Sequence, residues 1–207
     1  MAAGEQSYGR QVFINCPFSD DHRTLFEATV FAVADCGFQP RCALEADDAG
    51  EVRVEKIKRI IRQCKFGIHD LSVMGADQST GLARLNMSFE LGLFLGARWF
   101  GTKKVRDKVA LVLDRERFRY QTSLSDIAGQ DIRAHDGDPE RAIRHIRDWL
   151  QTASGDDNLP GGAALVKRYR EFADELPSLC GELGLSHGNL TFVDLSKVIS
   201  RWLKIEI

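Results

Sequence analysis

The fold is decided by one stretch of the sequence, residues 57–72, which reads IKRIIRQCKFGIHDLS. In its first half, Ile57, Ile60 and Ile61 recur at helical spacing and predict the apolar face of a helix over about residues 52–63. The second half, residues 66–72, is a compact apolar run of strand type that ends in polar groups. A helix that leads directly into a strand is the repeating unit of a parallel sheet with helices on its faces.

The same alternation extends to both sides of this stretch. We expect further strands over residues 12–14, 38–44, 109–113 and 131–134, and further helices over about residues 19–36, 86–98 and 139–150. Gly37 stands where a left-handed residue ends the first of these helices, and Pro139 stands at the start of the last. The pattern predicts an α/β protein with a parallel sheet of about five strands. In such sheets, ligands bind beyond the carboxyl ends of the strands.

Composition divides the chain into a disordered-looking lead over residues 1–10, an α/β domain over 11–152, a linker over 153–162 and a helical extension over 163–207. The linker is rich in Gly, Asp and Ser. The extension carries apolar residues at helical spacing, which predict helices over about residues 163–183 and 191–203. It is too short for an independent core, so we expect it to dock on the main domain or on another chain.

Charge and cysteine usage argue against several classes of function. The chain has 207 residues and a formal net charge of −2, which gives no electrostatic reason to expect tight binding of nucleic acid or of a membrane. No run approaches the ~18 apolar residues of a membrane span. The five cysteines are odd in number and form no CxxC pair, which disfavours a disulfide framework and a zinc site. We expect a cytoplasmic protein without a bound metal, whose thiols are reduced and mostly buried.

The strongest candidate for chemistry is Glu90, in the run NMSFELG over residues 86–92. It lies one turn into its expected helix, between Phe89 and Leu91. A carboxylate among apolar side chains is costly to bury unless it is paired or has a task. The helix N-terminus favours its anion while apolar walls raise its pKa, a combination that suits a nucleophile or an acid/base group. A glutamate that only stabilises the start of its helix is the plain alternative.

Other polar groups are expected on the same rim of the sheet. Asp70 ends an apolar strand and could accept both hydroxyls of a ribose, or it could cap a turn. The loop NCPF, residues 15–18, could line a base or phosphate pocket or form an ordinary strand-to-helix turn, and Cys16 is a candidate nucleophile. Asp47 and Asp48 could hold a metal, although such loop acids usually face solvent. The glycines have no dinucleotide or P-loop spacing, so the sequence supports neither kind of site.

Several short motifs follow one another in a recognisable order: VFIN at 12–15, DCGF at 35–38, an acidic loop with Gly50, the stretch 57–72, and NMSFELG at 86–92. This order resembles the TIR and TIR-like domains of bacteria, and it is similar to the related nucleoside 2-deoxyribosyltransferase fold. The resemblance covers about residues 11–150. It implies a flavodoxin-like, three-layer fold and a pocket built from several strand ends. Glu90 matches the family glutamate that attacks or stabilises the anomeric carbon of a sugar.

The resemblance also implies a set of substrate-binding residues: Asn15, Cys16, Pro17, Phe18, Asp70, Ser72, Asn86 and Met87. The loop that carries Asp47, Asp48 and Gly50 matches the loop that mediates assembly and gates the site in TIR domains. Bacterial TIR proteins are often NAD⁺-cleaving effectors or makers of NAD⁺-derived signals in anti-phage defence. The resemblance therefore implies an N-glycosidase that takes NAD⁺ as a substrate and needs no cofactor. It also implies a homo-oligomer or filament built through TIR-like surfaces and the C-terminal helices.

Two alternatives to this function stay open. Met87-Ser88-Phe89 stands where the TIR pattern usually has Trp-Cys before the glutamate, so the base that leaves is not identified. The first alternative is a nucleoside or nucleotide 2-deoxyribosyltransferase or N-hydrolase that uses the same residues. The second is a non-enzymatic TIR-like module that binds a nucleotide or assembles with partners.

Overall fold

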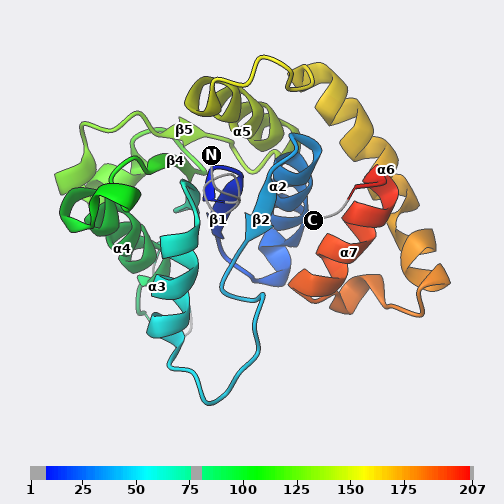
Figure 1. Cartoon of the computed structure of the whole chain (residues 1–207), viewed down its shortest axis with the longest axis horizontal. Helices are drawn as coiled ribbons and strands as arrows, with labels where there is room; N and C mark the ends of the chain where they lie inside the picture. Colours follow the sequence, from blue (N-terminus) through cyan, green and yellow to red (C-terminus); the bar gives the residue numbers. More distant parts are fainter. Residues whose placement is uncertain (1–7, 76–80, 206–207) are drawn as a thin grey trace.

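The computed structural model describes residues 8–75 and 81–205, and within them five strands form one all-parallel sheet (Figure 1). The strand order is β2-β1-β3-β4-β5, with β3 at the centre between β1 and β4. The strands are β1 (Gln11–Asn15), β2 (Gln39–Arg41), β3 (Phe66–Asp70), β4 (Val109–Asp114) and β5 (Arg133–Ala134). The predicted α/β class with a parallel sheet of about five strands is confirmed, and the strand order is compatible with a flavodoxin-like fold.

Six α-helices accompany the sheet in the described ranges. They are α2 (Arg23–Asp35), α3 (Arg53–Gln63), α4 (Asn86–Phe100), α5 (Pro139–Ser154), α6 (Gly162–Glu182) and α7 (Phe192–Leu203). Short 3-10 turns connect them at Asp20–His22, Lys103–Val105, Arg119–Thr122, Ser125–Ile127 and His187–Asn189. The expected helix starts and stops are largely confirmed: Gly37 has φ 77° after α2, and Asp138 caps α5 by accepting the backbone N–H of Glu140 at 2.9 Å.

Several predicted bounds were too long. The strand expected over residues 38–44 shrinks to Gln39–Arg41 at the sheet edge. Pro40 lies within this strand beside Val12 of β1, a position that an edge strand tolerates because its missing N–H faces the open side. The helix expected from residue 19 begins with a 3-10 turn, and its α-helical part starts at Arg23. The strand expected over 131–134 is reduced to its last two residues. Residues 76–80, between β3 and α4, lie outside the described residues.

Helices cover both faces of the sheet. On one face, Phe13 of β1 packs with Ile57, Ile60 and Ile61 of α3 and with Phe94 of α4. On the other face, β1, β3 and β4 pack against α2 and α5 (Figure 1). Successive residues of β1 point to opposite faces, so this buried strand contributes to both cores.

The C-terminal helices dock on the main domain, one of the two placements that the sequence left open. Phe31 on the outer side of α2 stacks on Phe172 of α6, with ring centroids 5.0 Å apart, and lies 5.7 Å from the ring of Trp202 on α7. Asp35 forms an ion pair with Arg168 at 2.7 Å. The predicted linker was too long at its start because α5 continues to Ser154, which leaves residues 155–161 between α5 and α6.

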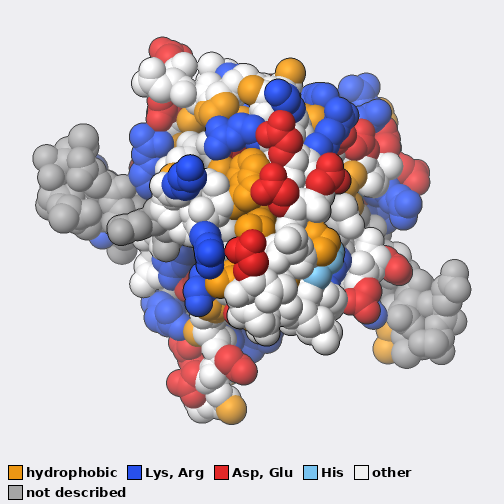
Figure 2. Space-filling model, turned by 90° about the vertical axis from the view of Figure 1, so that its right-hand side faces the viewer, with side chains coloured by type: hydrophobic (Ala, Val, Ile, Leu, Met, Phe, Trp, Pro, Cys, Tyr) orange, Lys and Arg blue, Asp and Glu red, His pale blue; other side chains and the backbone are white. Residues whose placement is uncertain are grey.

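The face formed by α6 and α7 carries mixed charge. Figure 2 shows basic and acidic side chains interspersed there around a narrow band of hydrophobic atoms. This face therefore presents no broad field of one sign. Among the described residues, none of the helices has the length and apolar character needed to cross a membrane.

Candidate functional site

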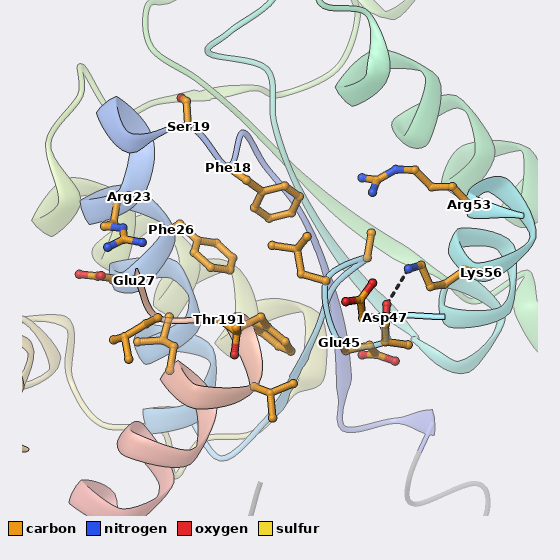
Figure 3. A pocket seen from close by; sticks show the side chains of 17 residues that line it. Phe18, Ser19, Arg23, Phe26, Glu27, Glu45, Asp47, Arg53, Lys56 and Thr191 are labelled. Atoms are coloured by element: carbon orange, nitrogen blue, oxygen red, sulfur yellow. Dashed lines mark hydrogen bonds between the residues drawn. The ribbon is translucent and has the colours of Figure 1, made fainter. Parts of the chain in front are cut away.

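Three cavities lie at the carboxyl ends of the strands. We call the first the aromatic cavity: it has a volume of about 490 Å³ and is lined by Phe18, Phe26 and Phe192 together with charged side chains (Figure 3). The second, the central cavity, has about 310 Å³, and its lining residues are Pro17, Phe18, Ser19, Arg53, Val73, Arg84, Asn86 and Met87. The third, the basic cavity, has about 570 Å³ and is lined by residues that include His22, Arg115, Arg119 and His135.

Shared walls make these cavities neighbours. Phe18, Ser19 and Arg53 line both the aromatic and the central cavity. Ser19, Val73 and Arg84 line both the central and the basic cavity. The three cavities therefore follow one another along the rim where ligands bind in open parallel sheets.

Glu90 lies on the buried side of α4 and is only 4% exposed. Burial raises the pKa of its carboxyl to about 7, and the positive charge of Arg53 opposes this rise. No hydrogen bond to the carboxylate contributes to the shift, so within the described residues the group is buried without a donor. It lies one helical turn after Asn86 and Met87, which line the central cavity, but the residues lining the three cavities do not include it.

Asp70 has the opposite environment. Its Oδ2 accepts a hydrogen bond from Nε2 of His22 at 2.9 Å and lies 3.3 Å from Nε2 of His135. Its Oδ1 accepts from the backbone N–H of Ser72 at 2.9 Å and from the Ser72 hydroxyl. Burial pushes the pKa of Asp70 up, but the hydrogen bonds from His135 and His22 outweigh it and hold the pKa well below its usual value. Both oxygens are therefore occupied, and this geometry favours a positioning role for Asp70 over the expected ribose contact.

Ser72 belongs to the same cluster. Its hydroxyl lies 2.9 Å from Nε2 of His135 and donates to Asp70. Ser72 and His135 also line the basic cavity. The structure thus brings Asp70 and Ser72 together as expected, and it adds two histidines that the sequence did not indicate.

Asn15 is buried below the central cavity and holds two strand ends to α4. Its side-chain N–H₂ donates to the backbone carbonyl of Met87 at 2.9 Å and lies 3.0 Å from Nδ1 of His69. Its Oδ1 is buried without a partner in the described part of the chain. Burial, reinforced by Lys108, lowers the pKa of His69 to about 3, so His69 is neutral. Asn15 fixes the start of α4 relative to β1 and β3.

The loop after β1 is buried at its start and exposed at its end, on the rim of the sheet. Cys16 and Pro17 are buried, whereas Phe18 is 37% exposed. Burial raises the pKa of the Cys16 thiol well above its usual value, which opposes the thiolate that a nucleophile requires. Phe18 packs edge-to-face on Phe26, with ring centroids 5.3 Å apart, and both rings face the aromatic cavity (Figure 3).

The loop of residues 45–50 borders the aromatic cavity through Glu45, Ala46 and Asp47. Lys56 of α3 donates to the carbonyl of Ala46 at 2.6 Å and so ties the loop to the helix (Figure 3). Asp48 accepts the backbone N–H of Gly50 at 2.8 Å, which closes a local turn. Within the described ranges, no group of three or more His, Cys, Asp or Glu residues is arranged to hold a metal ion.

Some residues at this rim had no signal in the sequence, and others had a weak one. His22 lies in a 3-10 turn, 48 residues from its partner Asp70, and no local pattern indicates the pairing. His135 directly follows β5, so a search for polar residues at every strand end would have found it. The start of α7 closes the aromatic cavity through Thr191, Phe192 and Leu195, which the sequence placed in a separate extension.

The fold and the site together define a class of protein: an α/β chain with an all-parallel sheet and a row of cavities at its carboxyl edge. Among the residues that the structure describes, no donor binds the buried carboxylate of Glu90. Comparisons of the chain with family models, with curated proteins and with solved structures give no match.

Proposed function

We propose that the protein is an N-glycosidase that cleaves the bond between base and ribose in a nucleotide, with NAD⁺ as the expected substrate and Glu90 as the reacting carboxylate. The observation that carries this proposal is the environment of Glu90. The carboxyl is buried without a hydrogen-bond donor, and its pKa of about 7 lets it be charged or protonated near neutral pH.

The chemistry requires a carboxylate near the anomeric carbon. When the C1′–N bond breaks, its electron pair leaves with the base and positive charge develops on the ribose. A carboxylate stabilises that charge or captures C1′ covalently, and water then completes the hydrolysis. Nicotinamide in NAD⁺ leaves as a neutral base, so this substrate needs no proton on its leaving group.

The aromatic cavity suits the leaving base. Phe18 and Phe26 offer ring surfaces at its wall (Figure 3). The ring of Phe192 also lines the cavity, and its centroid lies 6.2 Å from that of Phe26. Aromatic rings favour stacked or edge-to-face contacts with flat partners such as a nucleobase. The ribose would then lie in the central cavity, next to the first turn of α4.

Access to Glu90 requires a movement of Arg53. This arginine lines both cavities, is exposed and interacts electrostatically with Glu90. A substrate that displaces its guanidinium would reach the carboxylate between the two cavities.

The low exposure of Glu90 also favours a second candidate function, a module that binds a nucleotide without turning it over.

Assembly and biological role belong to the same proposal and rest on the family resemblance. The protein would act as an effector or signal maker in anti-phage defence, as an oligomer or filament. The loop that carries Asp47, Asp48 and Gly50 would regulate access, since it borders the aromatic cavity.

The test compares NAD⁺ turnover by the wild-type chain and by Glu90→Gln, measured as released nicotinamide. A matched control is Glu116→Gln, because Glu116 is an exposed loop glutamate that lines none of the three cavities. We expect turnover by the wild type and the control and none by Glu90→Gln. Equal rates, or no turnover by any of them even when oligomers are induced by crowding, would reject the enzyme.

A panel of deoxynucleosides and their monophosphates distinguishes the deoxyribosyltransferase or N-hydrolase alternative from NAD⁺ cleavage, with the released base as the readout. If the chain releases base from these compounds but not nicotinamide from NAD⁺, the proposed substrate is wrong and the proposed role of Glu90 stands. Saturable NAD⁺ binding without turnover, equal in the wild type and Glu90→Gln, would favour the binding module.

A further inference from the structure

The basic cavity stands beside the proposed glycosidase site and has a different chemistry. Its lining includes three arginines and two histidines, which are His22, Arg84, Arg115, Arg119 and His135. The one carboxylate among its lining residues is Asp21. A concave site with this balance of charge suits an anion with several oxygens.

Two carboxylates behind the cavity wall are already neutralised by protein groups. Asp114 accepts hydrogen bonds from Arg119, which also donates to the carbonyl of Leu71 at 2.7 Å. Asp70 is occupied by Ser72, His22 and His135, as described above. Neither carboxylate therefore faces the cavity as a free negative charge.

Hydrogen bonds engage specific nitrogens of the two histidines. The backbone N–H of Gly137 donates to Nδ1 of His135 at 3.0 Å. Because Asp70 is ionised and can only accept, Nε2 of His22 must be its donor. The second nitrogen of His22, Nδ1, has no partner among the described residues, and His22 lines the cavity.

Arg115 supplies an accessible positive charge. It directly follows β4, its side chain is exposed, and its guanidinium lies against Gly137. Within residues 8–75 and 81–205 no acidic side chain pairs with it, in contrast to Arg119. A planar guanidinium with free donors binds phosphate oxygens in a bidentate manner.

We infer that the basic cavity binds a phosphate ester, namely a phosphate group on the ribose of the substrate whose base occupies the aromatic cavity. This inference rests on the proposed function for the position of the ribose, since Ser19, Val73 and Arg84 connect the central and basic cavities. It narrows the substrate class to phosphorylated nucleosides. Free nucleosides would lack the contact with Arg115.

The first experiment measures phosphate binding without turnover. The full chain is titrated calorimetrically with inorganic phosphate and with ribose 5-phosphate at fixed ionic strength. The variant Arg115→Gln is compared with Arg117→Gln, which removes the same charge two residues away from an exposed side chain that does not line the cavity. We expect Arg115→Gln to weaken binding about tenfold, the effect of one lost charge-assisted hydrogen bond, and Arg117→Gln to leave it unchanged.

Two outcomes would overturn the inference at this stage. One is the absence of saturable binding of either compound. The other is equal weakening by both variants, which would indicate diffuse attraction without a built site. Binding of inorganic phosphate that ribose 5-phosphate does not displace would show that the cavity takes free phosphate, and this also overturns the ester assignment.

A second experiment separates this inference from the proposed function. Glu90→Gln should bind inorganic phosphate as the wild type does, because Glu90 does not line the basic cavity. Phosphate binding that depends on Arg115, without turnover by the wild type, would keep the phosphate site and reject the glycosidase. Turnover that depends on Glu90, with a KM unaffected by Arg115→Gln, would keep the glycosidase and reject the phosphate site.

Discussion

The burial of Glu90 makes a prediction that does not depend on any substrate. An unfolded chain exposes this carboxyl, whose ordinary pKa is 4.5, whereas the folded chain raises the pKa to about 7. Between these two pH values the folded state binds a proton that the unfolded state has already released. The wild-type protein should therefore lose stability as the pH rises from 4.5 to 7, and the loss should be complete above pH 7.

The difference between the two pKa values corresponds to about 3 kcal/mol of unfolding free energy. Glu90→Gln keeps nearly the same volume but carries no charge at any pH, so it should not show this loss. Relative to the wild type, the variant should become more stable by about 3 kcal/mol between pH 4 and pH 8. The cost of burying the amide of Gln changes the unfolding free energy of the variant by the same amount at both pH values, so it cancels from this comparison.

Urea unfolding, followed by circular dichroism at a series of pH values, measures this difference directly. Other buried carboxyls, such as Asp35 and Glu27, are present in both proteins and drop out of the comparison. Glu116→Gln serves as the control, because its side chain is exposed. If the free energies of wild type and Glu90→Gln run parallel from pH 4 to pH 8, the carboxylate is not buried in solution and the reasoning for its catalytic role is refuted.

Further predictions concern the packing around the site. Phe31→Ala should cost about 3–5 kcal/mol of stability and speed hydrogen exchange in α6 and α7, whereas the same change at the exposed Phe100 should do neither. Gly67→Ala should destabilise by roughly 1–3 kcal/mol, since a Cβ there would lie 2.7 Å from the ring of Phe94; Gly92→Ala, with open space around it, should be neutral or stabilising in the same thermal melts. All five cysteines are buried, so a thiol reagent should label them only after urea is added, and rapid labelling of the native chain would contradict this packing.

Local patterns in the sequence were sufficient to predict the order of helices and strands that forms the sheet. The stretch 57–72 predicted a helix and a strand from the spacing of its apolar residues, and both are present as α3 and β3. The exception is β2 at the sheet edge, which has only three residues and is shorter than its apolar pattern predicted. Periodicity works here because each element depends on its own residues and on the face that it buries.

The covering of α2 by the C-terminal helices was harder to predict. The buried residues of α2 lie on more than one face of the helix and include Ala28, Phe31 and Ala32. A helix that is apolar on nearly all sides must be covered on nearly all sides, so these residues carried a usable signal. The helix that covers them comes from more than 130 residues further along the chain, and no local pattern could name it.

Two carboxylates at the same rim show why the site could not be completed from the sequence. Asp70 and Glu90 were both expected at the carboxyl edge of the sheet. Burial by itself pushes the pKa of each carboxyl upward. Asp70 is supplied with donors by His22 and His135, which lie far from it in the sequence, so its charge is fixed. Glu90 receives no such donor among the described residues, so its proton is exchangeable near neutral pH. The fold therefore decides which carboxylate receives donors from distant parts of the chain. This difference supports the proposed role of Glu90 in the chemistry and a positioning role for Asp70.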